Sequence, residues 1–95
     1  MSRRHPDHRD ANEPEIITAF EKLGGFVHPL QGKAGLPDLL VGISGTWILV
    51  EVKNPTGRNR IGQAQQDFMN DCVYRNLVVH VARTVEDVER ICAKY

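Results

Sequence analysis

Long apolar runs, cysteines and aromatic residues are all scarce in this chain of 95 residues. A membrane-spanning helix needs roughly 18 or more consecutive apolar residues, and no segment approaches that length. The charged N-terminus, MSRRHPDHRD, also differs from a secretory signal, which needs an apolar stretch behind its basic residues. The sequence therefore predicts a soluble, cytoplasmic protein without a membrane partner.

The chain has no excess of positive charge, because 12 Lys and Arg residues balance 12 Asp and Glu residues. A nucleic-acid partner would have to be held by local basic patches. The two cysteines, Cys72 and Cys92, lie in apolar periodic segments, where a free thiol packs like a small hydrophobic residue. Without a CxxC or HxxxH pair nearby, we expect reduced thiols and no zinc site.

The length allows one small domain with a single core. Residues 1–11 contain several Arg and His residues and are predicted to form a flexible basic arm. Residues 12–95 are predicted to form the single folded domain.

Apolar periodicity predicts an α/β fold with the element order αβββαβα. Apolar residues at helical spacing indicate helices near 12–23, 61–75 and 84–95, with Asn12 and Thr84 as candidate N-caps. Runs of β-branched and aromatic residues predict strands near 26–30, 38–43, 46–52 and 77–82. The short linker Ser44-Gly45 predicts an antiparallel hairpin, so we expect a mixed sheet flanked by helices.

Charged residues interrupt two of the predicted strands. Asp38 opens the second strand, and Glu51 and Lys53 close the third. Because side chains alternate along a strand, Glu51 and Lys53 share one face, with the carbonyl of Val52 between them. A hairpin at 44–45 would bring Asp38 to the same end. Two carboxylates and a carbonyl oxygen suit Mg²⁺ or Mn²⁺.

The first helix offers a further carboxylate. Glu13 lies on the edge of the face formed by Ile16, Ile17 and Phe20, which is expected to pack against the sheet. Glu15 lies on a different side of the helix and is the alternative. Helical spacing favours Glu13 as the third metal ligand and leaves Glu15 open.

The spacing of these charges resembles a known nuclease pattern. Pro37-Asp38, twelve intervening residues and then Glu51-Val52-Lys53 resemble the PD-(D/E)XK nuclease superfamily. Within it, GLPDLLVG followed by WILVEVK and a helix carrying QxxF is similar to the virus-type replication-repair nuclease (VRR-NUC) domain, over about residues 12–92. The resemblance implies a restriction-endonuclease-like αβββαβ(α) core.

The resemblance also implies roles for individual residues. It implies that Asp38 and Glu51 bind the metal and that Lys53 orients or activates the attacking water. It implies that a glutamate of the first helix completes the site. The family's helix glutamine falls on Gln65, three residues before Phe68, while Gln63 and Gln66 are weaker alternatives.

These features together predict a Mg²⁺- or Mn²⁺-dependent endonuclease of a bacterial or phage-infected cell, without an organic cofactor. We expect it to act in DNA repair on structured or branched DNA, of flap or Holliday-junction type, and to form a homodimer. Basic residues expected to follow the DNA backbone are Lys33, Arg58, Arg60, Arg3, Arg4 and Arg9. The alternative is a catalytically silent module that binds nucleic acid or another protein.

Overall fold

The computed structural model describes residues 10–56 and 62–95. The elements are, in chain order, α1 (Glu13–Lys22), β1 (Phe26–Pro29), β2 (Leu39–Ile43), β3 (Thr46–Val52), α2 (Gln63–Tyr74), β4 (Val79–Ala82) and α3 (Val85–Cys92). This order confirms the predicted α/β fold. None of the helices in the described ranges is long and apolar enough to span a membrane.

The four strands form one mixed sheet in the order β1-β2-β3-β4. Strands β1 and β2, and likewise β2 and β3, are antiparallel, whereas β3 and β4 are parallel. The β2–β3 hairpin turns at Ser44 and Gly45, whose φ angles are 50° and 78°. Two successive positive φ angles are typical of the tight turns that join twisted antiparallel strands, so the predicted hairpin is confirmed.

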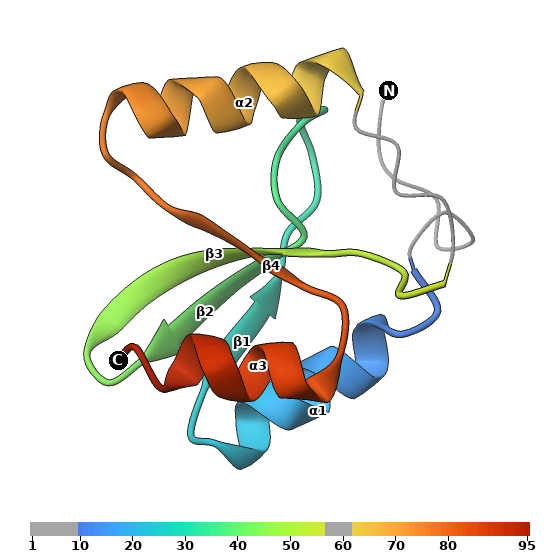
Figure 1. Ribbon diagram of the computed structural model, residues 1–95, viewed down its shortest axis with the longest axis vertical. Helices are drawn as coiled ribbons and strands as arrows, with labels where there is room; N and C mark the ends of the chain where they lie inside the picture. Colours follow the sequence, from blue (N-terminus) through green and yellow to red (C-terminus); the bar gives the residue numbers. More distant parts are fainter. Residues whose placement is uncertain (1–9, 57–61) are drawn as a thin grey trace.

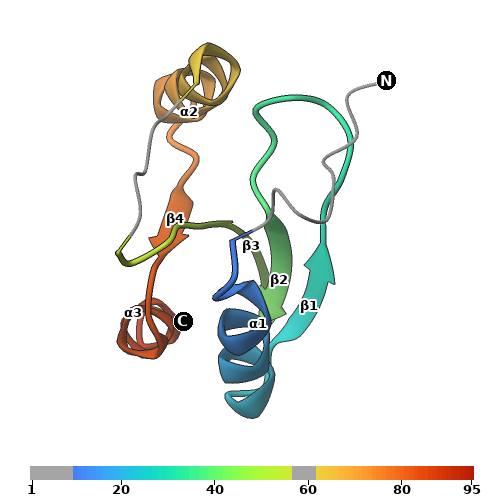
Figure 2. The same cartoon turned by 90° about the vertical axis from the view of Figure 1, so that its right-hand side faces the viewer.

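The core lies between the sheet and helices α1 and α3. Alternate residues of β2 and β3 are buried together with residues of the two helices: Leu39, Val41, Ile43, Ile48, Val50, Val52, Ile16, Phe20, Val88 and Ile91. Figure 1 and Figure 2 show α1 and α3 next to each other against the sheet, with α2 apart at the other end of the molecule. Because side chains alternate along β3, Glu51 points to the face opposite the core.

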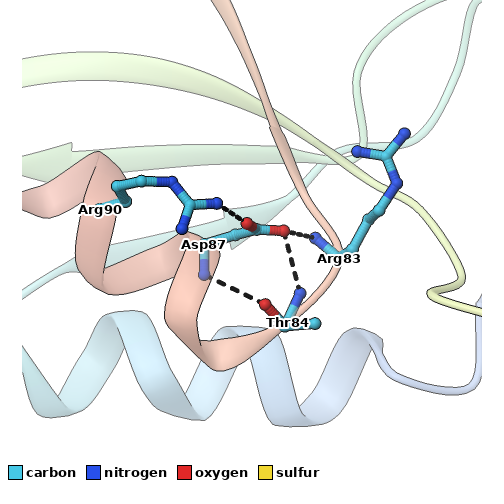
Figure 3. A network of polar contacts seen from close by, with 4 residues as sticks. All are labelled: Arg83, Thr84, Asp87 and Arg90. Atoms are coloured by element: carbon cyan, nitrogen blue, oxygen red, sulfur yellow. Dashed lines mark hydrogen bonds and ion pairs between the residues drawn. The ribbon is translucent and has the colours of Figure 1, made fainter.

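Helix α3 begins with a capping box at Thr84 (Figure 3). Thr84 Oγ1 accepts a hydrogen bond of 3.2 Å from the backbone N–H of Asp87. The Asp87 carboxylate accepts from the backbone N–H groups of Arg83 and Thr84, and Arg90 of the next turn pairs with it. The predicted Thr84 cap is therefore confirmed, and the end of β4 is joined firmly to α3.

The fourth strand begins later than the apolar pattern predicts. The prediction started it at Leu77, but Leu77 and Val78 are exposed and the strand begins at Val79. The reason is the end of α2, where Asn76 adopts a left-handed φ of 60°. The backbone N–H of Leu77 then bonds to the carbonyl of Cys72 at 2.8 Å. Residues 75–77 thus close the helix and cannot pair with the sheet.

Candidate active site

The β2–β3 hairpin places Asp38 beside Glu51. Leu39 pairs with Val50 in the antiparallel register, so Asp38, one residue before Leu39, lies opposite Glu51. The backbone N–H of Val52 donates a hydrogen bond of 2.8 Å to Asp38 Oδ2. Both carboxylates are buried, with exposed fractions of 1% for Asp38 and 6% for Glu51. The predicted meeting of these charges at one end of the sheet is confirmed.

Lys53 lies beside Glu51 at the end of β3. Its Nζ lies 3.4 Å from Glu51 Oε2, as expected for side chains two residues apart on one strand face. Lys53 Nζ also donates a hydrogen bond of 3.1 Å to Gln65 Oε1 on α2. The ammonium group is therefore held between a carboxylate on the sheet and an amide on a helix.

The three glutamines of α2 differ in what they contact. Gln65 is half-buried and reaches Lys53. Gln63 instead donates to Asp67 at 2.8 Å, and Gln66 donates to Asn70 at 2.9 Å, both on the exposed surface of the same helix. The structure thus brings Gln65 to the site and leaves the two alternatives outside it.

The burial of two carboxylates side by side raises the pKa of Glu51. Desolvation raises the pKa of Glu51 above the ordinary value of 4.5, and the neighbouring charge of Asp38 raises it further. Hydrogen bonding from Gln65 and the charge of Lys53 act in the opposite direction. Glu51 Oε1 is also buried without a hydrogen-bond partner among the described residues. Such an oxygen is costly unless a cation or a proton satisfies it.

The two glutamates of α1 are in different environments. Glu13 is 5% exposed, whereas Glu15 is exposed. The predicted placement of Glu13 on the packed face is therefore confirmed. Within residues 10–56 and 62–95, however, no three His, Cys, Asp or Glu side chains are grouped closely enough to hold a metal ion. The structure brings Asp38 and Glu51 together, and the role of Glu13 as a third ligand stays a prediction.

Asn12 contributes to the site in a way that the sequence did not indicate. It occupies the N-cap position of α1, but its side chain makes no capping hydrogen bond. Its Nδ2 instead donates to the carbonyls of Lys53 at 3.0 Å and Arg83 at 2.9 Å. Asn12 thus ties the start of α1, and with it Glu13, to the ends of β3 and β4. These partners are 41 and 71 residues away, so no local pattern could have revealed them.

The oxygen donors fit a small divalent cation. Asp38 and Glu51 supply carboxylates, and the orphaned Glu51 Oε1 is suited to a metal. The Val52 side chain has no donor atom and is buried in the core, so Val52 could contribute only its main-chain carbonyl. That contribution stays a prediction.

The predicted DNA contacts lie mostly beyond the part of the chain that the structure describes. Lys33 is exposed in the loop between β1 and β2, and its contact with DNA stays a prediction. The remaining basic residues lie outside the described ranges: Arg3, Arg4, Arg9, Arg58 and Arg60.

The free thiols are confirmed, because Cys72 and Cys92 form no disulfide.

Comparisons with protein-family models, with curated proteins and with solved structures found no match to this chain.

Proposed function

We propose that the protein is a metal-dependent nuclease that hydrolyses phosphodiester bonds in DNA. One observation carries the proposal: Asp38 and Glu51 are buried side by side, and Lys53 Nζ lies 3.4 Å from Glu51. A surface ion pair between Glu51 and Lys53 at a strand end would not need a second buried carboxylate beside it. Clusters of this kind, with a perturbed pKa, are typical of functional sites.

Mg²⁺ or Mn²⁺ would be held by Asp38, Glu51 and the main-chain oxygen of Val52, with Glu13 as the further candidate. When bound, such an ion neutralises phosphate charge and lowers the pKa of a coordinated water. The chain supplies the rest of the chemistry. The Lys53 ammonium is positioned to orient the attacking water and to stabilise the negative charge that develops on the phosphate.

Gln65 holds the side chain of Lys53 in one orientation. Its Oε1 accepts a hydrogen bond of 3.1 Å from Lys53 Nζ, and this bond keeps the ammonium beside Glu51. A flexible lysine loses side-chain freedom when it is held at two points. This loss of side-chain entropy occurs on folding, before the substrate binds. The lysine is therefore already oriented for catalysis.

The proposed substrate is structured or branched DNA. Within residues 10–56 and 62–95, all the elements form one α/β unit around a single sheet, without a separate module for reading base sequence. Recognition would therefore depend on backbone contacts and DNA shape. A homodimer would place two such sites on two strands of a flap or a four-way junction.

The proposal is tested by incubating the protein with flap, splayed-arm and four-way-junction DNAs in Mg²⁺, Mn²⁺ or EDTA. We expect cleavage with either ion and none with EDTA. Asp38→Asn and Glu51→Gln should each abolish cleavage and leave DNA binding largely intact, because they remove metal ligands and not phosphate contacts.

Glu86→Gln and Glu89→Gln are matched controls, because both residues are exposed carboxylates on α3. They should cleave at the wild-type rate. Binding of DNA without cleavage under every ion condition would refute the nuclease proposal and favour a silent binding module. Wild-type rates for Asp38→Asn or Glu51→Gln would refute the assignment of the site.

A further inference from the structure

Helix α2 carries one side chain into the candidate site although most of the helix is exposed. Of the residues that the structure describes in α2, only Cys72 is buried, and the helix lies apart from α1 and α3 (Figure 1). Its residue Gln65 nevertheless makes the 3.1 Å hydrogen bond to Lys53. The start of α2 is thus the part of the helix that approaches the end of β3.

The loop between β1 and β2 meets the first turn of α2 at Gly35. A Cβ atom at Gly35 would lie 2.4 Å from the carbonyl oxygen of Ala64 and 3.1 Å from the backbone nitrogen of Gln65. Both neighbours are backbone atoms of the helix, so no side-chain rotation could relieve the overlap. Only glycine lets the loop and the helix lie this close.

The same loop leads directly into Asp38. The backbone N–H of Leu30 bonds to the carbonyl of Asp38 at 2.7 Å and closes the base of the loop. A second bond, from the N–H of Leu36 to the carbonyl of Lys33 at 3.2 Å, shapes its middle. Gly35 therefore lies three residues before Asp38 in a loop closed by backbone hydrogen bonds. It also lies against the backbone of Ala64 in the helix that carries Gln65.

We propose that Gly35 is a positioning residue of the site. Its contact with Ala64 sets the position of α2, and α2 in turn places Gln65. Gln65 then holds the Lys53 ammonium beside Glu51. The expected effect on cleavage rests on the proposed function, whereas the effect on Gln65 does not.

The geometry gives the size of the effect. With an alanine at position 35, the loop and α2 would have to separate by about 1 Å to reach an ordinary van der Waals distance. If α2 moves by this amount and carries Gln65 with it, the hydrogen bond that is now 3.1 Å long exceeds the usual range. A misplacement of about 1 Å in a catalytic group typically costs about 100-fold in rate.

The test compares Gly35→Ala with two matched glycine variants. Gly24 has a φ of +91°, nearly identical to the +92° of Gly35, but a Cβ atom at Gly24 would meet no described atom within 4 Å. Gly32 lies in the same loop, has a φ of +133° and also faces open space. Gly24→Ala and Gly32→Ala therefore share the backbone strain of Gly35→Ala without its overlap with α2.

The first measurement needs no DNA. The side-chain amide of Gln65 is followed by ¹⁵N NMR, and Lys53→Met defines its position when the hydrogen bond is lost. Gly35→Ala should move the Gln65 signal toward the Lys53→Met position, and the two control variants should leave it unchanged. A Gln65 signal that stays at its wild-type position in Gly35→Ala would overturn the proposal.

The second measurement is DNA cleavage. Gly35→Ala should lower kcat about 100-fold with little change in KM. In a Gln65→Leu background it should lower kcat by less than about twofold, because its effect passes through Gln65. A full additional loss in that background would overturn the proposal. Absence of cleavage by the wild-type protein would refute the proposed function, and the NMR result would still decide the role of Gly35.

A measurement on the wild-type protein covers the case in which Gly35→Ala does not fold. The close approach predicts an NOE between a Gly35 Hα proton and the backbone amide proton of Gln65, whose nitrogen would lie 3.1 Å from a Cβ atom at Gly35. Its presence supports the contact on which the proposal depends. Its absence would overturn the proposal without any variant.

Discussion

Replacing Lys53 by methionine tests whether the buried charges of the site depend on one another. Lys53 and Glu51 have side-chain exposed fractions of 12% and 8%, and their charged atoms are 3.4 Å apart. At an effective dielectric constant of about 20, this distance corresponds to an attraction of about 5 kcal/mol. Removing one partner of a buried pair leaves the other charge uncompensated, and we expect a net loss of about 3 kcal/mol in the free energy of unfolding.

The loss should depend on pH in a defined direction. Burial and the charge of Asp38 raise the pKa of Glu51, and Lys53 is one of the groups that lower it. Without Lys53 the folded-state pKa of Glu51 rises further. A carboxyl group with a raised pKa destabilises the fold above that pKa, and the penalty disappears as the pH falls below the ordinary value of 4.5. The difference between Lys53→Met and the wild type should therefore be largest near neutral pH and shrink toward about pH 4.

Thermal and urea unfolding, followed by circular dichroism in EDTA at several pH values, measure this difference. For a domain of this size, about 3 kcal/mol corresponds to a fall of about 12–24 °C in Tm near neutral pH. Lys33→Met is the control, because Lys33 is exposed, and it should change stability by less than about 0.5 kcal/mol. Equal stability of Lys53→Met and the wild type at neutral pH, or a loss independent of pH, would refute the reasoning.

The remaining predictions concern the metal and the helix ends. Under limiting Mg²⁺, Glu13→Gln should raise the Mg²⁺ concentration needed for cleavage, and Glu15→Gln should not, because of these two residues only Glu13 is buried. The reverse result would assign the ligand to Glu15. Ca²⁺ should support DNA binding with little cleavage, because its larger and looser coordination shell acidifies and positions water less well; equal rates in Ca²⁺ and Mg²⁺ would contradict the mechanism. Thr84→Ala removes the oxygen that accepts from Asp87 and should cost about 1 kcal/mol in urea unfolding, whereas an unchanged midpoint would show that this cap adds no stability.

Local sequence signals were sufficient for the framework of the site. Alternation along β3 placed Glu51 and Lys53 on one face, and the Ser44-Gly45 turn returned the chain so that Asp38 met them. Both signals act over a few residues, through strand pleating and the backbone angles of a tight turn. Asp38 and Glu51 are thirteen positions apart in the chain, but the hairpin makes their meeting a consequence of local geometry.

Tertiary packing decided which glutamine serves the site. The sequence favoured Gln65 through its resemblance to a family motif and left Gln63 and Gln66 open. The choice depends on the rotation of α2 about its axis and on its distance from β3. Neither quantity is encoded in the residues of α2 alone, because the contact at Gly35 comes from a loop about thirty residues earlier in the chain.

Tertiary packing also decided the partners of Asn12 and the raised pKa of Glu51. Composition and spacing identified both residues, but the hydrogen bonds of Asn12 to Lys53 and Arg83 span 41 and 71 residues. The raised pKa of Glu51 arises from burial, which comes from several elements packing together. The sequence by itself determined which chemical groups share one end of the sheet, because pleating and turns are local. Only the tertiary structure decided how deeply those groups are buried and which distant residues hold them, because burial and long-range hydrogen bonds depend on how helices and loops pack against that sheet.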